Sequence, residues 1–131
     1  MLKFKSHEGF RQRLLLATLS QKTIRIDDIR ADAESHSITG LTDYEISFLR
    51  LLEKLTNGTK IEISHTGTTL VYRPGVLIGG TISHECPLSR AIGYFLEPFI
   101  ALAPFSKHPI SLTLTGITNN NVDVSFLSKL T

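Results

Sequence analysis

Apolar and polar residues alternate over several short stretches of the chain, which is the pattern of half-buried β-strands. Two of these stretches flank a His-Thr-Gly turn and therefore predict a hairpin, and a Pro-Gly turn follows the second of them. The stretch nearest the amino terminus is short and is expected at the edge of a sheet. The predicted strands cover residues 2–5, 23–29, 60–64, 68–73, 76–83 and 110–115.

Three longer apolar stretches predict helices. The first lies near 10–20. The second begins at Thr42, because this threonine can cap a helix while Glu45, three residues on, reaches back to the cap's own amide. Asn57 and Gly58 supply a left-handed residue that would end this helix.

The third helical stretch covers 88–105 and contains Pro98. Proline lacks a backbone donor and clashes with the preceding turn, so a kink or break is expected there. Aromatic side chains in these two helices could stack on bases, but their helical spacing favours packing in the core. The core candidates are Tyr44, Phe48, Leu51, Leu52, Leu55, Tyr94, Phe95, Phe99 and Leu102.

The order of elements is β, α, β, α, β, β, β, α, β, with a polar loop at 32–40. This order predicts an α+β fold in which helices pack on one face of a mixed sheet. A length of 131 residues and an apolar content of 41% suit one domain with a modest core.

Charge and cysteine content narrow the classes of function only slightly. The net charge is +2, and the first thirty residues are locally basic, which fits either an RNA-binding surface or an ordinary solvated face. The single cysteine, Cys86, cannot form an internal disulfide and suits a reducing, intracellular compartment. No apolar run approaches the roughly twenty residues needed to cross a bilayer, so no membrane role is expected.

Several short phrases, in order along most of the chain, resemble the RNA 3'-terminal phosphate cyclase family. Further phrases are similar to its cyclase-like branch, and after Asn121 the similarity fades. The family phrases are Ile29-Arg30-Ala31, Gly40-Leu41, Thr56-Asn57-Gly58, Tyr72-Arg73-Pro74-Gly75 with Gly79-Gly80, and Gly116-Ile117-Thr118-Asn119. The branch phrases are Leu16-Ala17-Thr18-Leu19-Ser20, Asp43-Tyr44-Glu45, Gly67-Thr68-Thr69 and Leu102-Ala103-Pro104-Phe105-Ser106-Lys107.

The resemblance implies a fold of βαββ-type modules in proteins about three times this length. Residues 1–131 are then expected to be the amino-terminal part of a cyclase-like domain, with the remainder of the family domain absent from this chain.

Active cyclases carry a glycine-rich stretch with a glutamine and then an arginine, and the corresponding stretch here is 7–15. Its matching residues are Glu8, Gly9 and Gln12. Glycines of the family are replaced by His7, Phe10 and Arg11, and its arginine by Leu15. A phosphate cradle needs bare backbone, so the side chains of Phe10 and Arg11 are expected to obstruct it.

A second departure from the cyclases lies in the last helix, where Glu97 stands in place of a glutamine. A carboxylate near phosphates is unfavourable and donates no hydrogen bond. Glu8, Gly9, Gln12 and Glu97 are therefore interpreted as a degenerate nucleotide or phosphate site, with no catalytic residue, metal or cofactor assigned.

The resemblance implies a ribosome biogenesis factor of the nucleolar small-subunit processome that acts in early precursor rRNA processing without cyclase activity. The expected location is the nucleus and nucleolus. Expected partners are a ribosome-assembly GTPase, precursor rRNA and snoRNP, and RNA contact could be direct or through the GTPase. Candidate contact residues are Arg11, Arg13, Arg30, Arg73, Arg90 and Lys107, because arginine forks suit phosphate or carboxylate partners. An ordinary surface or structural ion pair is the alternative for each, and is favoured for Arg73.

Two enzymatic alternatives stay open: an ATP-dependent RNA 3'-terminal phosphate cyclase, and an endoribonuclease acting on precursor rRNA. The group nearest to hydrolytic or metal chemistry is His84-Glu85-Cys86. Neighbouring residues of a strand point to opposite faces, so a buried Cys86 and an exposed His84 are expected instead of a metal site.

Overall fold

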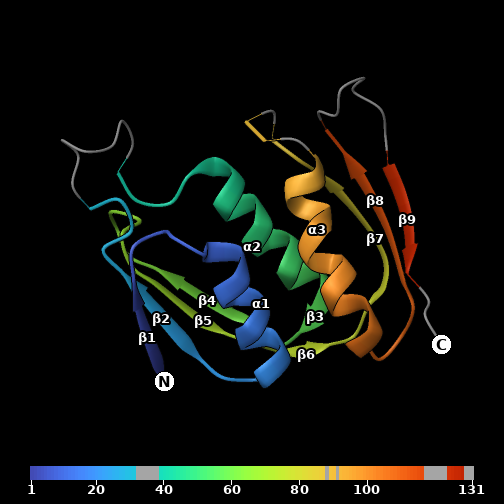
Figure 1. The fold of residues 1–131 in the computed structure, drawn as a ribbon, viewed down its shortest axis with the longest axis horizontal. Helices are drawn as coiled ribbons and strands as arrows, with labels where there is room; N and C mark the ends of the chain where they lie inside the picture. Colours follow the sequence, from blue (N-terminus) through green and yellow to red (C-terminus); the bar gives the residue numbers. More distant parts are fainter. Residues whose placement is uncertain (32–38, 88, 91, 117–123, 129–131) are drawn as a thin grey trace.

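The computed structural model describes residues 1–31, 39–87, 89–90, 92–116 and 124–128. Helices are interspersed among the strands along the chain (Figure 1). The helices are α1 (Phe10–Ser20), α2 (Asp43–Leu55), α3 (Ile92–Leu102) and the short 3-10 helix η1 (Ala103–Phe105). The strands are β1 (Leu2–Lys5), β2 (Ile24–Asp27), β3 (Thr56–Asn57), β4 (Lys60–Ile63), β5 (Leu70–Arg73), β6 (Val76–Leu77), β7 (Gly80–Glu85), β8 (Ile110–Thr115) and β9 (Val124–Ser128).

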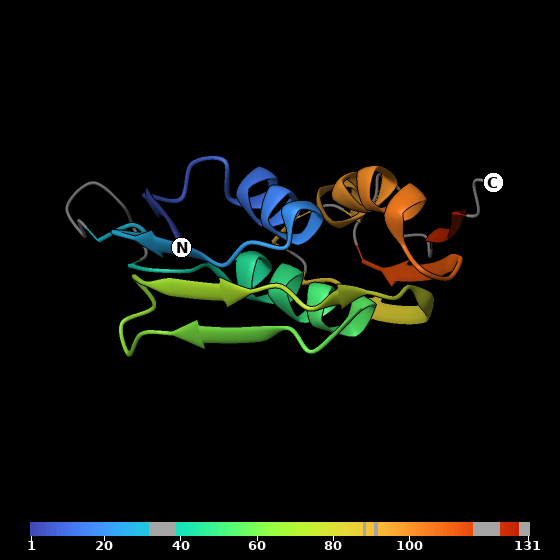
Figure 2. The same cartoon turned by 90° about the horizontal axis from the view of Figure 1, so that it is seen from below.

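A four-stranded mixed sheet has the order β1-β2-β5-β4. β1 and β2 are parallel and joined through α1, whereas β5 runs antiparallel to both β2 and β4. Ile24 and Ile26 of β2 and Leu70 and Tyr72 of β5 are buried, and their neighbours in sequence are not. The sheet therefore buries one face, which the helices cover (Figure 2).

A second unit has the order β7-α3-β8-β9, in which β7 and β8 are parallel and β9 is antiparallel to β8. Between the two units, β3 and β6 form a two-stranded ribbon. The predicted α+β class with mixed sheets is confirmed, and the structure adds that the described strands divide among three sheets.

Buried apolar residues from both units join into one core cluster. Phe48 of α2 sits at its centre, with its ring centroid 6.2 Å from that of Phe99 and 6.3 Å from that of Tyr94, both edge to face. Phe48, Phe95 and Phe99 are fully buried, as predicted, while Tyr44 and Tyr94 are half-buried against the core. This core fixes the three helices side by side, and three of the candidate arginines, Arg11, Arg30 and Arg90, lie where the first turns of these helices meet.

The predicted end of α2 is wrong. The helix stops at Leu55, and Thr56 is extended rather than left-handed. Thr56 and Asn57 instead pair with Leu77 and Val76 as β3. Gly58 does adopt a positive φ of 90°, but in the turn after this strand. Pairing with a distant segment therefore decides where the helix ends.

The single strand predicted at 76–83 is also wrong, because it is broken into β6 and β7. The break lies at Gly79, which has a φ of 86° and an ideal Cβ position only 2.4 Å from the His108 carbonyl oxygen. The chain leaves one sheet at this residue and enters another. The predicted loop at 32–40 falls mostly outside the described residues, as do Leu88 and Ala91 of the third predicted helix.

Pro98 does not break α3, which runs from Ile92 to Leu102. η1 follows directly and ends at Phe105. The helix therefore continues through a residue that donates no hydrogen bond to the carbonyl four positions back.

Candidate functional site

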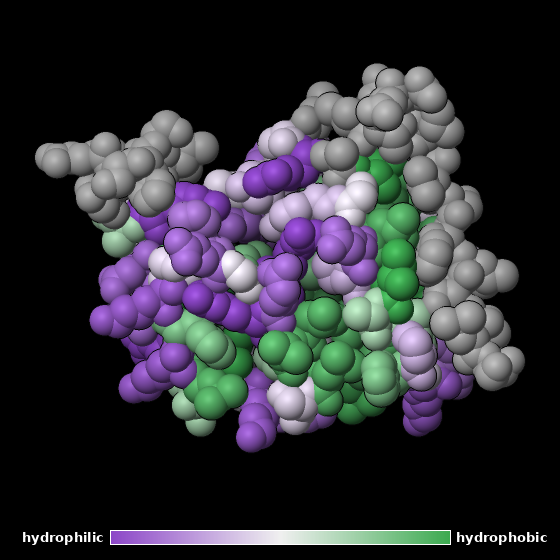
Figure 3. All heavy atoms as spheres, in the orientation of Figure 1, coloured by the Kyte–Doolittle hydropathy of each residue, from purple (hydrophilic) through white to green (hydrophobic). Residues whose placement is uncertain are grey.

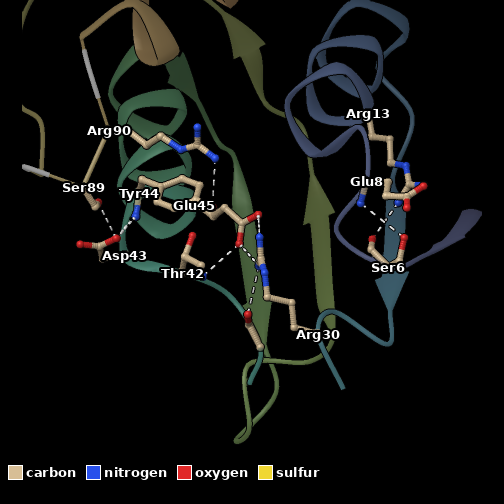
Figure 4. A network of polar contacts seen from close by, with 11 residues as sticks. Ser6, Glu8, Arg13, Arg30, Thr42, Asp43, Tyr44, Glu45, Ser89 and Arg90 are labelled. Carbon is tan, nitrogen blue, oxygen red and sulfur yellow. Dashed lines mark hydrogen bonds and ion pairs between the residues drawn. The ribbon is translucent and has the colours of Figure 1, made fainter. Parts of the chain in front are cut away.

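A hollow of about 170 Å³ lies where the first turns of α1, α2 and α3 come together. Figure 4 shows four of its lining residues, Arg30, Tyr44, Glu45 and Arg90, with their polar contacts. It brings together two segments that were singled out separately in the sequence: Gly9, Arg11 and Gln12 lie on one side, and α3 lies on the other. Its lining residues are His7, Gly9, Phe10, Arg11, Gln12, Arg30, Tyr44, Glu45, Arg90 and Tyr94.

Gly9 forms the start of α1 with a left-handed φ of 63° and no side-chain cap. Phe10, the next residue, is 4% exposed and belongs to the core. The Phe10 side chain packs into the core and also contributes to the lining of the hollow, and its expected obstruction of a phosphate at this turn stays a prediction. Of the side chains of Phe10 and Arg11, that of Arg11 extends across the site to α3.

Arg11 ties α1 to α3. Its Nη1 donates a 3.0 Å hydrogen bond to the carbonyl oxygen of Tyr94, which lies four residues before Pro98 and therefore receives no helical hydrogen bond from it. The guanidinium also lies 4.4 Å from the centroid of the Tyr94 ring and 3.6 Å from a carboxylate oxygen of Glu97. Arg11 thus supplies the donor that proline lacks, and this explains how α3 passes Pro98 unbroken.

Arg30 is held in a bidentate ion pair with Glu45, at 2.6 and 3.1 Å. The two side chains are only 10% and 3% exposed. Glu45 also accepts the Thr42 amide at 2.9 Å, so the predicted capping box is confirmed. Burial alone would lower the pKa of Arg30, but the hydrogen bonds and charge of Glu45 outweigh it and raise that pKa. Arg30 is thus a structural cation at the floor of the hollow.

Arg90 is exposed and lies over two aromatic rings at the rim of the hollow. Its guanidinium carbon is 4.6 Å from the centroid of Tyr44 and 5.3 Å from that of Tyr94. The two tyrosine rings meet edge to face at 5.2 Å. Burial raises the pKa of Tyr94, so its phenol stays neutral. Arginine and tyrosine therefore alternate across the site, and Arg90 is the cation most available to a partner.

The remaining candidate cations lie elsewhere. Arg13 donates to the carbonyl oxygens of Lys5 and Ser6 at 3.1 and 2.9 Å and so fastens the loop between β1 and α1. Arg73 pairs with Glu62 across β4 and β5 at 3.1 Å, the ordinary ion pair favoured for it. Lys107 is exposed in the segment that follows η1. Glu8, of the degenerate site, is exposed, and its amide donates to the Ser6 hydroxyl.

His84 is 8% exposed, so the expectation that it is exposed is wrong, whereas Cys86 is buried as expected. His84 accepts a hydrogen bond from Lys54 at Nδ1, 3.0 Å away, because an ammonium can only donate. Its Nε2 then carries the proton and donates to the Ser47 hydroxyl at 2.7 Å. A histidine protonated at this position cannot activate Ser47 as a nucleophile. Among the described residues no group of three histidine, cysteine or acidic side chains could hold a metal ion.

We expect the protein to lose stability as the pH falls from about 6.5 towards 4. Burial, with the nearby charge of Lys54, lowers the pKa of His84 to about 4. The unfolded chain therefore binds a proton at His84 before the folded chain does, which favours unfolding by roughly 2 to 3 kcal/mol across this interval. Urea unfolding at pH 7 and pH 4.5 measures it, with His84→Gln as the control that lacks this titration. An equal pH dependence in both proteins would contradict the assignment.

Comparison with known proteins places these features in a family. The family model described as RNA 3'-terminal phosphate cyclase matches residues 2–128, which is nearly the whole chain. The chain belongs to this family. No helix in the described part of the chain is long and apolar enough to span a membrane.

Family members similar to this chain carry cyclase-like or rRNA-processing names. A probable RNA 3'-terminal phosphate cyclase-like protein of Dictyostelium discoideum is 55% identical over 126 residues, covering 95% of this chain and 33% of that protein. An rRNA processing protein of Schizosaccharomyces pombe is 54% identical over 122 residues, covering 93% and 33%. The RNA 3'-terminal phosphate cyclase-like protein of Homo sapiens is 53% identical over 115 residues, covering 88% and 30%. The chain thus spans about a third of the length of these relatives.

The sequence does not predict the roles of Glu45, Tyr44 and Tyr94 in this hollow. Glu45 was recognised as half of a capping box, but nothing local shows that it also binds Arg30, fifteen positions away. Tyr44 and Tyr94 were assigned to the core, although each also supports an arginine. The branch phrase Asp43-Tyr44-Glu45 and the capping pattern of Thr42 and Glu45 are the signals in the sequence that point to this turn.

Proposed function

We propose that this chain is part of a ribosome biogenesis factor that takes part in early precursor rRNA processing in the small-subunit processome and has no cyclase activity. The similar proteins with rRNA-processing names support the first part. The interior of the hollow supports the second.

The observation that carries the proposal is how the cations of the hollow are used. A phosphate-transfer site needs free guanidinium groups and bare backbone where the anion arrives. Here Arg11 is committed to Tyr94 and Glu97, and Arg30 to Glu45. Of the three arginines that line the hollow, Arg90 at its rim is the one without an ion-pair partner among the described residues, and its guanidinium lies over the rings of Tyr44 and Tyr94. Glu45 adds negative charge to the lining of the hollow, and Glu97 pairs with Arg11 from outside that lining. The described residues therefore favour a binding or scaffolding role over transfer of a nucleotide.

In this proposal the partners are a ribosome-assembly GTPase, precursor rRNA and snoRNP, and the protein works in the nucleolus. Arg90 and Lys107 are the contact residues that the structure best supports, because both are exposed and neither has an ion-pair partner among the described residues. Arg13, Arg30 and Arg73 hold the protein's own carbonyl or carboxylate groups.

Affinity purification of the tagged full-length protein from cell extract tests the proposal. We expect processome proteins, the GTPase and precursor rRNA to be enriched over an untagged control. Arg90→Ala should lower the recovered precursor rRNA or GTPase several-fold if Arg90 is a contact. Arg50→Ala is the matched control, because Arg50 is an exposed arginine of α2 whose one ion-pair partner among the described residues is neighbouring Glu53. No change with Arg90→Ala would remove Arg90 from the contact surface.

The same purified protein tests for cyclase activity. We expect no ATP-dependent labelling of the protein, and no 2',3'-cyclic phosphate when it is given ATP and RNA with a 3'-phosphate. Labelling together with a cyclic product would overturn the non-enzymatic assignment, whatever the purification recovers.

A further inference from the structure

The charged residues on the solvent face of the four-stranded sheet are mostly cations. Side chains alternate along each strand, so the residues between the buried positions of β1, β2, β4 and β5 point to solvent. Figure 3 shows hydrophilic side chains gathered towards the side of the molecule where β1 and β2 lie, and hydrophobic ones over α1 and α3. We call this solvent side of the sheet the cationic face. Its charged residues are Lys3, Lys5, Arg25, Asp27, Lys60, Glu62 and Arg73.

The cationic face holds more net positive charge than the whole chain does. Its five cations and two acids give a net charge of +3, whereas the formal net charge of the chain is +2, so the other residues together are slightly acidic. The solvent face of β7 and β8 carries hydroxyl side chains and one acid instead. These residues are Thr81, Ser83, Glu85, Ser111, Thr113 and Thr115. Exposed strands of this protein therefore do not carry cations as a rule.

Two cross-strand pairs on the cationic face place cations directly opposite one another. Lys3 of β1 lies opposite Arg25 of β2, and Lys60 of β4 lies opposite Arg73 of β5. Neighbouring strands are only about 4.8 Å apart, and like charges directly opposite one another destabilise a sheet. An anion that lies over the face would relieve this repulsion in both pairs.

The two acids of the cationic face are occupied by its arginines. Asp27 pairs with Arg25 at 3.0 Å, and Glu62 pairs with Arg73 at 3.1 Å. The hydrogen bond from Arg25, with the charges of Arg25 and Lys3, lowers the pKa of Asp27, so this acid is ionised at neutral pH. The acids therefore balance the arginines and leave the lysines of the face uncompensated.

Three lysines of the cationic face are free to meet an anion. Lys3, Lys5 and Lys60 are exposed, and none has an ion-pair partner among the described residues. They lie on β1 and β4, the two outer strands of the sheet, and so flank the arginines of the inner strands. None of the three lines the hollow between the helices. The cationic face is therefore a surface separate from that hollow.

The side chains of the cationic face fit the phosphate backbone of a nucleic acid better than a protein surface. Protein interfaces have an apolar, often aromatic centre with few charges. In the four strands the one apolar residue on this face is Val71, which is partly buried. Interfaces with nucleic acid are much more positively charged and contact mainly phosphates. Since these strands place no aromatic side chain on the face, bases have nothing there to stack on, and binding should depend little on sequence.

We propose that the cationic face binds the phosphate backbone of single-stranded RNA, without preference for sequence, through Lys3, Lys5 and Lys60. The backbone attracts the three free lysines and also relieves the repulsion within the two cation pairs. RNA contact by this protein is then direct. The choice of RNA over another polyanion rests on the proposed function.

Salt-dependent binding of RNA to the purified full-length protein tests this proposal, with a labelled single strand that has no 3'-phosphate. Lys3→Gln, Lys5→Gln and Lys60→Gln each remove one cation of the face, and Arg50→Gln is the matched control, an exposed cation of α2. Each lysine variant should bind several-fold more weakly. It should also lower the slope of log affinity against log salt by about 0.7, the value for one phosphate contact with a single strand. Arg50→Gln should leave the slope unchanged.

Two further measurements separate phosphate contact from a structural role of these lysines. Lys60→Arg keeps the charge and should bind as the natural protein does, and the losses in the glutamine variants should be equal for a uridine homopolymer and an RNA of mixed sequence. Thermal unfolding should show no loss of stability in Lys3→Gln or Lys60→Gln, because each lysine lies opposite an arginine.

Three outcomes would overturn the proposal. The first is a salt slope that is the same in the lysine variants as in Arg50→Gln, or no RNA binding by the natural protein at low salt. The second is a lysine variant that binds RNA normally but loses a processome protein in the affinity purification, which would assign the face to an acidic protein. The third is aggregation of the variants with unchanged RNA affinity, which would assign the lysines to protection of the two outer strands. Each leaves the proposed function to be decided by the purification of the natural protein.

Discussion

Arg30→Met is expected to destabilise the protein by about 3 to 5 kcal/mol, because it leaves the Glu45 carboxylate buried without its cation. The carboxylate is 3% exposed and also serves the cap of α2, so it cannot turn to solvent without giving up the Thr42 amide. Methionine keeps most of the volume of the side chain, so the loss reflects charge more than packing. Urea unfolding of the purified full-length protein measures it.

Arg73→Met is the matched control for this prediction. Its ion pair with Glu62 is exposed on both sides, at 41% and 66%, and its loss should cost less than about 1 kcal/mol. Similar losses for the two variants would contradict a structural role for Arg30. Because Arg30→Met is expected to lose stability, its RNA binding should be measured only under conditions in which the variant is folded.

Gly79→Ala is expected to cost about 3 kcal/mol or more. The residue has a φ of 86°, which L side chains rarely adopt, and a Cβ there would lie 2.4 Å from the His108 carbonyl oxygen. That carbonyl belongs to a backbone fixed by the bond from the His108 amide to Ile78, so it cannot move aside freely. The substitution would force apart β6, β7 and the segment that enters β8.

Gly80→Ala separates the two causes of this loss. Gly80 also has a positive φ, of 101°, but a Cβ there meets nothing within 4 Å. We expect only the conformational cost, about 1 to 2 kcal/mol. Thermal unfolding of both variants beside the natural protein gives the comparison. A Gly79→Ala loss no larger than that of Gly80→Ala would show that the close approach to His108 is unimportant.

Local patterns predicted the elements whose partners lie close in sequence. The edge strand β1, the hairpin of β4 and β5, and the start of α2 at Thr42 all follow from alternation, turn residues or capping chemistry. Where the decisive partner is distant, the prediction failed. Val76 and Leu77 recruit Thr56 and Asn57 into β3, which shortens α2, and alternation along 76–83 carries no sign that the chain changes sheets.

In the candidate site, too, the sequence predicts which segments are involved but not the contacts between distant residues. The resemblance predicts one degenerate site made of Glu8, Gly9, Gln12 and Glu97. The structure brings Arg11, which lies in the same stretch as the first three, within 3.6 Å of Glu97. The actual commitments of the arginines could not be deduced, since each depends on a contact across the fold. Arg11 and Tyr94 are 83 positions apart, and Arg30 and Glu45 are 15 positions apart.

The bond from Arg11 to the Tyr94 carbonyl also makes two remote positions genetically dependent on one another. While Pro98 is present, a residue at position 11 without a side-chain donor leaves the Tyr94 carbonyl without the hydrogen bond that Arg11 gives it. With a residue at position 98 that has a backbone N–H, the Tyr94 carbonyl can accept the ordinary hydrogen bond of the helix. The Arg11 guanidinium is then free to contact other groups in the hollow. In evolution, replacement of Pro98 would therefore come first, and replacement of Arg11, or its use for another contact, would follow.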